Sequence, residues 1–482
     1  MKKAIVWFRN DLRLHDNEVL FEALSWADEI LPIYIFDPRQ FANHELGFPK
    51  TGHHRLQFIQ ESVQDLRLNL QDLGADLIVR TGHPEDVLFS LARYHEAFSI
   101  FCQEESCSEE RAVEDKLVAN MDTIEGEVNF YWGFSLLHYE DLPFKLTAVP
   151  EQFTIFRKKV EKDFRIRPTF PSPEKLTVIP GVDSGEIPAG DELIRHSEEP
   201  VTPETKLEKV KGGETHGIIR VKNYIWETGR IAQYKETRNG LLGTDYSSRF
   251  SAWLAHGCLS PRQIYYEVKK YEQEVESNPS TYWLIFELLW RDYFRFMSLK
   301  HEDEIFKAGG IRKSGIGGYQ DAMSFHRWAE GNTGIPFIDA AMRELLATGY
   351  TSNRARQNVA SFFVKDMKMD WRIGAAWFES QLVDYDPASN YLNWNYIAGI
   401  GNDPREGRYF NVLSQAKRYD PTGAFVKHWI PELRKLPSSR IHTPFHLNEV
   451  EQEYLTIRLG QEYPRPCINL KDWRALKKKS HY

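Results

Sequence analysis

The stretch AIVWFRNDLRLHDNEVLFEALSWADEILPIYIFD (4–37) predicts the architecture of the N-terminal part of the chain. It holds an apolar run (4–8), a charged turn, a helical pattern (17–27) and a second apolar run (29–37). Nearly continuous apolar runs are typical of parallel strands buried on both faces. The turn lacks glycine, which excludes a GxGxxG fingerprint and an NAD-type site. Its charged residues are expected to form a buried structural network: Arg9, Asp11, Arg13 and Asp16.

The same alternation of strand and helix continues to about residue 135. Helical patterns cover 53–74, 84–95 and 108–121, and they alternate with apolar runs in ADLIVRTG (75–82), SIFCQ (99–103) and VNFYW (128–132). Repeated strand–helix–strand units predict an α/β domain over 1–135, built on a doubly wound parallel sheet. Ligands of such sheets bind beyond the carboxyl ends of the strands.

Residues 136–214 are predicted to form a long interdomain connector, because prolines punctuate a polar sequence with one convincing helix at 153–164. From residue 215 to 482 we expect an all-α domain. Its central helix is YWLIFELLWRDYFRFM (282–297), which is apolar on almost every side. The exceptions are charged residues that need partners or a ligand: Glu287, Arg291, Asp292 and Arg295.

Length and composition agree with a two-domain globular protein. The chain has 482 residues, 41% of them hydrophobic, and a net charge of −8, so no overall basic field points to nucleic acid. Four cysteines without a CxxC pair indicate neither disulfides nor a metal site. The N-terminus does not resemble a signal peptide, and no apolar run is long enough to span a membrane. We therefore expect a soluble cytoplasmic protein.

Three polar stretches of the helical region are candidate ligand sites. SNRARQNVASFFVKDMKMDW (352–371) begins as a helix, and DYDPASNYLNWNY (384–396) brings acceptors, amides and large rings together, as a pocket for a flat molecule with polar edges would. Ser247, Ser248, Ser251 and Arg249 of YSSRFS (246–251) could surround a phosphate. A capped loop and a simple helix N-cap explain these stretches about as well. The residues alone predict a cofactor-binding protein that is an enzyme.

Five blocks resemble the photolyase/cryptochrome family in sequence, order and spacing: WFRNDLRLHDN (7–17), SSRFSAWLAHGCLSPR (247–262), ELLWRDYFRF (287–296), WAEGNTGIPFIDAAMREL (328–345) and DYDPASNYLNWNY (384–396). The resemblance covers roughly residues 3–432. Within the family, NRARQNVASFF, LLWRDYF and GIGNDPREGRYFN look most similar to the cryptochrome-DASH branch.

The resemblance implies that FAD binds in a bent shape within the helical domain. Residues matching the phosphate- and ribose-binding positions, with one from the central helix, are Tyr234, Ser247, Ser248, Arg249, Phe250, Ser251 and Arg291. Residues expected near the ring system are Glu287, Asn353, Arg356, Asp384, Asp386 and Asn390. Asn390 matches the asparagine that faces flavin N5, which is associated with a fully reduced flavin. The Arg356–Asp384 pair can stay buried because each charge compensates the other.

The reaction implied by the resemblance is light-driven repair of cyclobutane pyrimidine dimers. An electron passes from excited reduced FAD to the dimer, the ring splits and the electron returns; the protein orients the reactants. The lesion must be flipped out of the strand. Glu287 would hydrogen-bond the dimer, Trp290 would stack on it and Asn353 lies at the same opening. Candidates for a phosphate-binding rim, each equally explicable as an ordinary surface arginine, are Arg238, Arg354, Arg405 and Arg408.

The chain departs from the family pattern in its electron-transfer and lesion-binding residues. Trp394 and Trp371 resemble the first two members of the tryptophan chain that feeds the flavin, whereas the third position holds Gly318. The outer member is Tyr319 or another residue. Tyr396 replaces the second lesion-stacking tryptophan, and Gln357 replaces a methionine.

Less stacking surface offers less to offset the cost of extracting a base from a duplex. We therefore predict repair of single-stranded DNA, with duplex DNA and RNA as weaker partners. We also expect the protein to be a monomer. Asn353 and Gln357 also occupy the positions of the paired histidines of (6-4) photolyases. The lack of a proton donor there argues against the (6-4) reaction.

An antenna is expected between the domains, where the family binds methenyltetrahydrofolate. The candidates follow the strand SIFCQ: Glu104, Glu105, Glu109 and Glu110. Carboxylates suit the N–H donors of a pterin, but a solvated acidic helix start explains the same residues.

Two rivals to repair remain open. One is a blue-light photoreceptor or regulator that binds FAD and nucleic acid without significant repair, and the other is a flavin-binding scaffold. Asn390, Glu287 and Trp290 favour repair.

Overall fold

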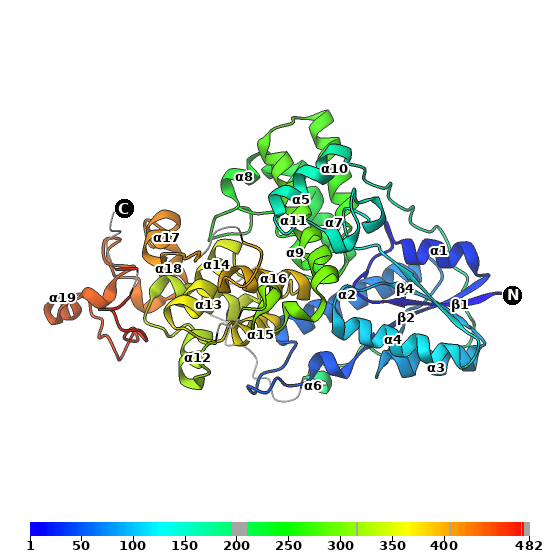
Figure 1. The fold of residues 1–482 in the computed structure, drawn as a ribbon, viewed down its shortest axis with the longest axis horizontal. Coiled ribbons are helices and arrows are strands. Elements are labelled where there is room, and N and C mark those ends of the chain that lie inside the picture. The colour runs from blue at the N-terminus through cyan, green and yellow to red at the C-terminus, as the bar shows by residue number, and fades with distance from the viewer. Residues whose placement is uncertain (195–209, 315–316, 404–406, 474, 477–482) are drawn as a thin grey trace.

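The N-terminal part of the computed structural model is a five-stranded parallel sheet in the order β3-β2-β1-β4-β5 (Figure 1). The structure describes residues 1–194, 210–314, 317–403, 407–473 and 475–476. The strands are β1 (Lys3–Phe8), β2 (Glu29–Phe36), β3 (Ile78–Thr81), β4 (Ser99–Gln103) and β5 (Glu127–Tyr131). The predicted parallel sheet is therefore confirmed.

Helices cover both faces of this sheet: α1 (Glu18–Trp26), α2 (His53–Asp72), α3 (Pro84–His95) and α4 (Ser108–Asp122). The alternation of side chains along β1 assigns the faces. Ala4 and Val6 belong to the core that contains α1 and α2, whereas Ile5 and Trp7 pack with α3 and α4. The first of these cores continues into the helical domain, so one face of the sheet supports the rest of the molecule.

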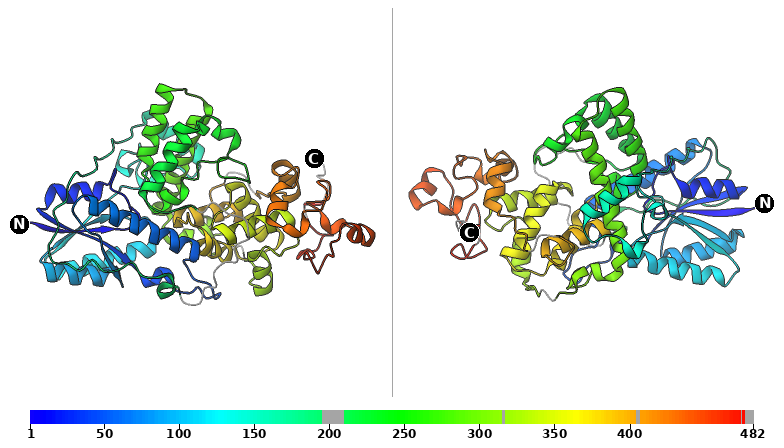
Figure 2. Two further views of the ribbon diagram at one scale, coloured as in Figure 1. Left: turned by 180° about the vertical axis from the view of Figure 1, so that it is seen from behind. Right: turned by 45° about the horizontal axis from the view of Figure 1, so that its top comes forward.

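The remainder of the described chain is helical, as predicted (Figures 1 and 2). The expected connector contains α5 (Phe153–Val160) and the short α6 (Gly190–Leu193). Beyond it follow α7 (Glu214–Lys222), α8 (Tyr234–Thr237), α9 (Ser251–Ala255), α10 (Pro261–Glu274), α11 (Pro279–His301), α12 (Ala322–Ala329), α13 (Pro336–Thr348), α14 (Asn353–Ser361), α15 (Trp371–Gln381), α16 (Pro387–Ala398), α17 (Val412–Tyr419), α18 (Ala424–Trp429) and α19 (Glu449–Tyr454). In the part of the chain that the structure describes, no helix has the length and apolar character that a membrane span needs.

Helix α11 is the predicted central helix, and the structure supplies partners for its buried charges. The Asp292 carboxylate accepts hydrogen bonds from the backbone N–H groups of Leu136 (3.1 Å) and Leu137 (2.7 Å) in the connector. Burial nevertheless raises the pKa of Asp292 to about 6. Arg295, one turn further along, pairs with Asp386 of the helical domain. The helix thus joins the connector to the region of the predicted ligand site.

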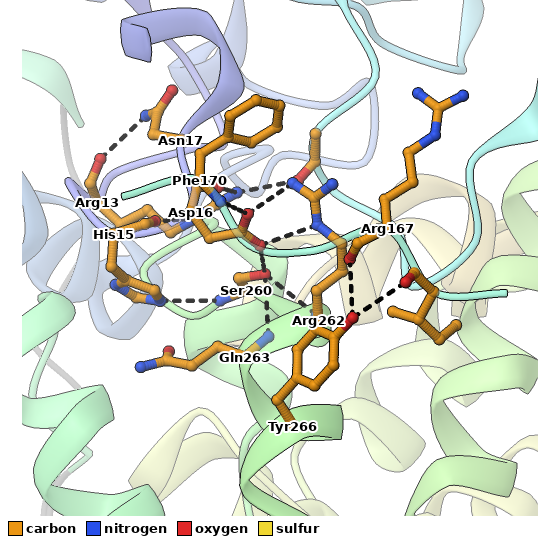
Figure 3. Close-up of polar contacts among 12 residues, drawn as sticks. Arg13, His15, Asp16, Asn17, Arg167, Phe170, Ser260, Arg262, Gln263 and Tyr266 are labelled. Carbon is orange, nitrogen blue, oxygen red and sulfur yellow. Dashed lines mark hydrogen bonds and ion pairs between the residues drawn. The ribbon is translucent and has the colours of Figure 1, made fainter. Parts of the chain in front are cut away.

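The charged turn after β1 forms a buried clamp between the two domains (Figure 3). Asp16 forms an ion pair with Arg262 at 2.7 Å, and Ser260 donates a hydrogen bond to the same carboxylate. Arg13 donates to the Gly257 carbonyl at 2.8 Å. A Cβ atom at Gly257 would lie 1.9 Å from the Asn10 carbonyl oxygen, so only glycine permits this approach. The predicted structural network is confirmed, and it fixes how the sheet domain meets the helices.

Candidate functional site

A cavity of about 490 Å³ opens in the helical domain and adjoins a smaller one of about 100 Å³. Of the residues predicted to bind a cofactor or a lesion, those that line the larger cavity are Tyr234, Arg238, Ser247, Ser248, Arg249, Phe250, Ser251, Glu287, Trp290, Arg291, Asn353, Arg356, Gln357, Asp384, Asp386, Tyr396 and Arg408. Asn390 and Trp394 line the smaller one. The structure therefore brings together residues separated by about 170 positions of sequence.

The loop before α16 contributes an unsatisfied acceptor to the wall shared by both cavities. Oδ2 of Asp384 accepts from Arg356 at 2.9 Å, and Arg356 is held in turn by the Thr351 carbonyl at 2.8 Å. Burial opposes the charge of Arg356, but Asp384 outweighs it and raises the pKa of the guanidinium. Oδ1 of Asp384 is buried without a partner among the described residues. A buried orphan acceptor in a cavity wall needs a ligand that carries a donor.

Asp386 uses its carboxylate oxygens in contacts with the protein itself, which the sequence did not indicate. It caps α16 by accepting from the Ser389 N–H at 2.7 Å, and its other oxygen pairs with Arg295. Although burial works against the charge, Arg295 and Arg291 hold the pKa of Asp386 at about 2. Both carboxylate oxygens therefore have protein partners, and the residue acts as the anchor that places α16 against α11.

The YSSRFS loop forms another part of the wall of the larger cavity and contains a donor without a partner among the described residues. Arg249 adopts a left-handed conformation with φ of 56°, and its Nη2 donates to the Gly243 carbonyl at 2.7 Å. The guanidinium lies over the Tyr350 ring at 4.6 Å, while its Nε is buried without a partner among the described residues. Arg220 binds the carbonyls of Ser247 and Ser248, at 3.0 Å each, and so fixes the loop. The orphan Nε provides a charged donor for an anionic ligand.

Helix α11 presents Glu287, Trp290 and Arg291 to the larger cavity, since residues three and four apart share one face of a helix. Trp290 stacks on Phe153 of α5 with ring centroids 3.7 Å apart, and Tyr396 meets the same indole edge-on at 6.0 Å. Arg291 donates to the carbonyls of Phe134 (2.5 Å) and Leu254 (2.8 Å). Burial, with Arg295 nearby, lowers the pKa of Arg291 to about 9. Its guanidinium is therefore tied to the backbone at the edge of the cavity.

The two predicted electron-transfer tryptophans are buried on neighbouring helices. Trp394 packs so closely on α15 that a Cβ atom at Gly374 would lie 2.3 Å from its ring. Trp371, also on α15, donates its indole N–H to the Ala308 carbonyl at 3.1 Å. A side chain at Gly318 would start 2.4 Å from the backbone nitrogen of Asp370, so this backbone cannot hold a tryptophan there.

Tyr319, the alternative outer member of the electron-transfer chain, lines an open groove together with Trp371. The tyrosine is 67% exposed. This position places a tyrosine side chain at the surface beside Trp371, the second of the two predicted tryptophans.

Of the arginines predicted to form a rim, Arg238 and Arg408 line the larger cavity, whereas Arg354 does not. Arg238 pairs with Glu287 at 2.5 Å, and Arg408 pairs with Asp403. Arg354 donates to Gln357 and to Asn239, at 2.9 Å in both cases. Arg405 lies outside the described residues.

A second cavity, of about 520 Å³, lies between the two domains. Glu105, Glu109 and Glu110 line it, whereas Glu104 does not. Oε2 of Glu110 is buried without a partner among the described residues. Burial, with the charge of Glu105, raises the pKa of Glu110 to about 8. This cavity therefore contains a carboxyl oxygen without a hydrogen-bond partner among the described residues, as the larger cavity of the helical domain does at Asp384.

Sequence reasoning missed several residues of both cavities. Tyr246, Tyr350, Ser389 and Asn393 also line the larger one. In the interdomain cavity Tyr391 donates to Glu379 at 3.2 Å, and Arg55 lies over the Tyr385 ring at 4.6 Å. Tyr246, Tyr385, Ser389, Tyr391 and Asn393 lie inside the quoted stretches YSSRFS (246–251) and DYDPASNYLNWNY (384–396), so these motifs already contained the signal although the side chains were not singled out.

Two family models match the chain, one described as DNA photolyase over residues 4–174 and one described as FAD binding domain of DNA photolyase over residues 283–481. The chain is 51% identical to a protein named cryptochrome DASH from Gloeobacter violaceus over 469 residues, which cover 97% of this chain and 93% of that one. The chain belongs to the cryptochrome-DASH branch of the photolyase/cryptochrome family. The predicted family and its FAD-binding domain are confirmed.

Solved structures agree with this assignment. A cryptochrome from Synechocystis sp. PCC6803 superposes with a TM-score of 0.93 at 48% identity, covering 98% of this chain and 97% of that one. A class III photolyase from Agrobacterium tumefaciens gives 0.84 at 27% identity, with 98% and 95% covered. A photolyase from Sulfolobus tokodaii, whose structure holds two FAD molecules, gives 0.75 at 28% identity, with 97% and 96% covered. The two-domain fold is thus common to cryptochromes and photolyases.

Proposed function

We propose that this protein uses blue light to repair cyclobutane pyrimidine dimers, with a preference for single-stranded DNA. The observation that supports the proposal most strongly is one cavity that combines two sets of residues. Glu287 and Trp290 offer a hydrogen-bonding carboxylate and an aromatic face, and Asp384 and Arg249 offer an orphan acceptor and an orphan donor. A lesion and a flavin nucleotide would therefore lie side by side.

The unsatisfied groups of the cavity fit the chemistry of FAD. Oδ1 of Asp384 can accept the ring N–H, and Arg249 with the serines of its loop can bind the phosphates. Asn390 and Trp394 would lie beside the ring, since both line the smaller cavity. When bound, FAD supplies the electron that light excites and that splits the dimer.

The protein's own contribution is to bind and orient the lesion. Glu287 would accept the imide N–H of a pyrimidine, and Asn353 could bond a carbonyl at the same opening. Phe153 covers one face of Trp290 and so leaves the opposite face for stacking. These contacts would hold the dimer against the cofactor and exclude water from it.

The preference for single strands rests on Tyr396. Its ring meets Trp290 edge-on, so the pair forms a corner in place of two broad stacking faces. Base–aromatic stacking is worth about 1–3 kcal/mol per base. A smaller stacking surface offsets less of the free energy needed to unpair the bases of a duplex. A single strand does not require this unpairing.

The interdomain cavity is proposed to hold an antenna chromophore. Glu105, Glu109 and Glu110 offer carboxyl groups to a pterin such as methenyltetrahydrofolate, and the orphan oxygen of Glu110 makes it the first candidate. The Sulfolobus tokodaii photolyase structure contains two FAD molecules, so a second flavin is the alternative occupant. Extraction of the purified protein followed by chromatography distinguishes folate from flavin.

Illumination of the reduced, FAD-loaded protein with a dimer-containing single strand tests the repair proposal. Dimers should disappear in blue light and persist in the dark. Glu287→Ala should retain FAD and repair at least about tenfold more slowly, since a hydrogen bond to a charged group is worth about 1.5–3 kcal/mol. Light-driven reduction of the flavin without any loss of dimer would refute repair and favour the photoreceptor alternative.

A further inference from the structure

The carboxylate that faces the lesion pocket is already engaged by an arginine from the rim. Nη1 of Arg238 lies 2.5 Å from Oε1 of Glu287, and the indole N–H of Trp283 donates to the same oxygen at 3.1 Å. Both partners of the ion pair line the cavity, and their side chains remain 23% and 28% exposed. The pair therefore lies in the wall of the pocket, where incoming groups can reach it.

The surroundings of this ion pair favour an additional anion. The Arg238 guanidinium and the Lys235 ammonium lie 5.5 Å and 4.8 Å from the Trp283 ring. Arg354 is bonded to neutral amides at Gln357 and Asn239. Burial, together with repulsion from Arg238 and Arg418, lowers the pKa of Arg354. Cations thus gather around Arg238, and a phosphate would relieve their mutual repulsion.

Resting on the proposed function, we propose that Arg238 is an exchangeable counter-ion of Glu287. A backbone phosphate that enters the mouth takes the Arg238 guanidinium, and this exchange releases Glu287 to hydrogen-bond the base. A phosphodiester accepts an arginine in the same two-pronged manner as a carboxylate, so the exchange replaces one charged contact by another. A free base carries no phosphate and leaves the Arg238–Glu287 ion pair intact. Arg238 therefore selects for the phosphate of a nucleotide chain before Glu287 contacts the base.

The exchange predicts a change in the affinity for a nucleotide chain that is opposite in sign to the change expected if the ion pair were purely structural. Glu287→Gln removes the carboxylate that competes for Arg238, so an undamaged oligothymidylate should bind the FAD-loaded variant more tightly. The expected gain is about fivefold, the scale of a partly exposed ion pair. The gain should vanish when the same oligothymidylate carries an uncharged methylphosphonate backbone. It should also vanish in the Arg238→Gln background and persist in the Arg238→Lys background.

Fluorescence anisotropy of the labelled oligothymidylate measures these affinities, and bound FAD reports folding. Glu236→Gln is the matched control, because it removes a carboxylate from neighbouring α8 that bonds Ser280 and does not line the cavity. Should Glu287→Gln fail to retain FAD, Glu287→Asp withdraws the carboxylate from Arg238 and should tighten binding as well.

No gain for Glu287→Gln, a gain that survives in the Arg238→Gln background, or an equal gain for Glu236→Gln would overturn the exchange. The undamaged strand requires no repair. A failure of the repair assay would therefore leave the exchange standing, and a failure of the exchange would leave repair standing.

Discussion

Replacing Asp384 by asparagine tests the assignment of the flavin ring to the cavity beside α16. Oδ2 of Asp384 is used by Arg356 at 2.9 Å, and Oδ1 is buried without a partner among the described residues. Asparagine keeps the shape but converts one acceptor into a donor. In one orientation the new NH2 group faces the Arg356 guanidinium, and in the other it faces the ring N–H of the ligand.

Either orientation of the introduced amide loses a hydrogen bond to a charged group, which is worth about 1.5–3 kcal/mol. Because about 1.4 kcal/mol corresponds to tenfold in affinity, FAD should bind between about tenfold and 150-fold more weakly. Titration of apoprotein with FAD, followed by flavin fluorescence, measures the change. The matched control is Asp370→Asn, since Asp370 also pairs with an arginine, Arg372 at 2.6 Å, but does not line the cavity. FAD affinity within threefold of wild type for Asp384→Asn would refute the placement of the ring.

Three further predictions follow from the same geometry. Gly374→Ala places a methyl group 2.3 Å from the Trp394 ring and should lower the free energy of unfolding by about 1–3 kcal/mol. Gly133→Ala meets open space and should leave the free energy of unfolding unchanged, and thermal or urea unfolding compares the two variants. Trp394→Phe should retain FAD and slow its photoreduction, which flavin absorbance follows under illumination; an unchanged rate would remove Trp394 from the electron-transfer chain. Burial raises the pKa of Glu110 to about 8, so the antenna-free folded state holds a proton that the unfolded state has lost, and stability must fall as the pH rises from about 5 to 8. Glu110→Gln should therefore gain thermal stability over wild type at pH 8 but not at pH 5, while Glu109→Gln, at a side chain 76% exposed, should show no such trend.

The sequence predicted the layers of the fold because local patterns encode them. The apolar runs around Val6 and Ile33 have side chains buried on both faces, which only a sheet covered on both sides permits. The charged turn was also interpreted correctly, since Arg13 and Asp16 follow directly after a buried strand and cannot remain unpaired there. Such inferences need only the immediate neighbours in the chain.

The partners of individual charges in the site could not be predicted in the same way. Asp386 pairs with Arg295, which lies 91 positions away, and Arg291 binds the Phe134 carbonyl 157 positions away. The resemblance placed both residues near the cofactor, but only the packing of α11 against α16 and the connector shows how far the protein itself uses them. Likewise, Phe153 stacks under Trp290 because α5 lies against α11, and nothing in the sequence of either helix specifies that contact.

The antenna glutamates illustrate the limit of a motif that describes position without direction. Glu104 and Glu105 are adjacent at the end of β4, so an extended backbone points their side chains to opposite sides. Glu105 lines the interdomain cavity, whereas Glu104 does not. The orphan carboxyl oxygen of Glu110 could be identified only from the packing around it.

The most direct test of the proposed repair compares the initial rate of dimer loss in one oligonucleotide, presented first alone and then annealed to its complement. Reduced, FAD-loaded protein is illuminated with blue light, and the remaining dimers are quantified by chromatography. The proposed pocket, with Tyr396 beside Trp290, predicts rapid loss in the single strand, much slower loss in the duplex and none in the dark. Persistence of the dimer in the illuminated single strand would contradict repair itself, and equal rates on both substrates would contradict the role assigned to Tyr396.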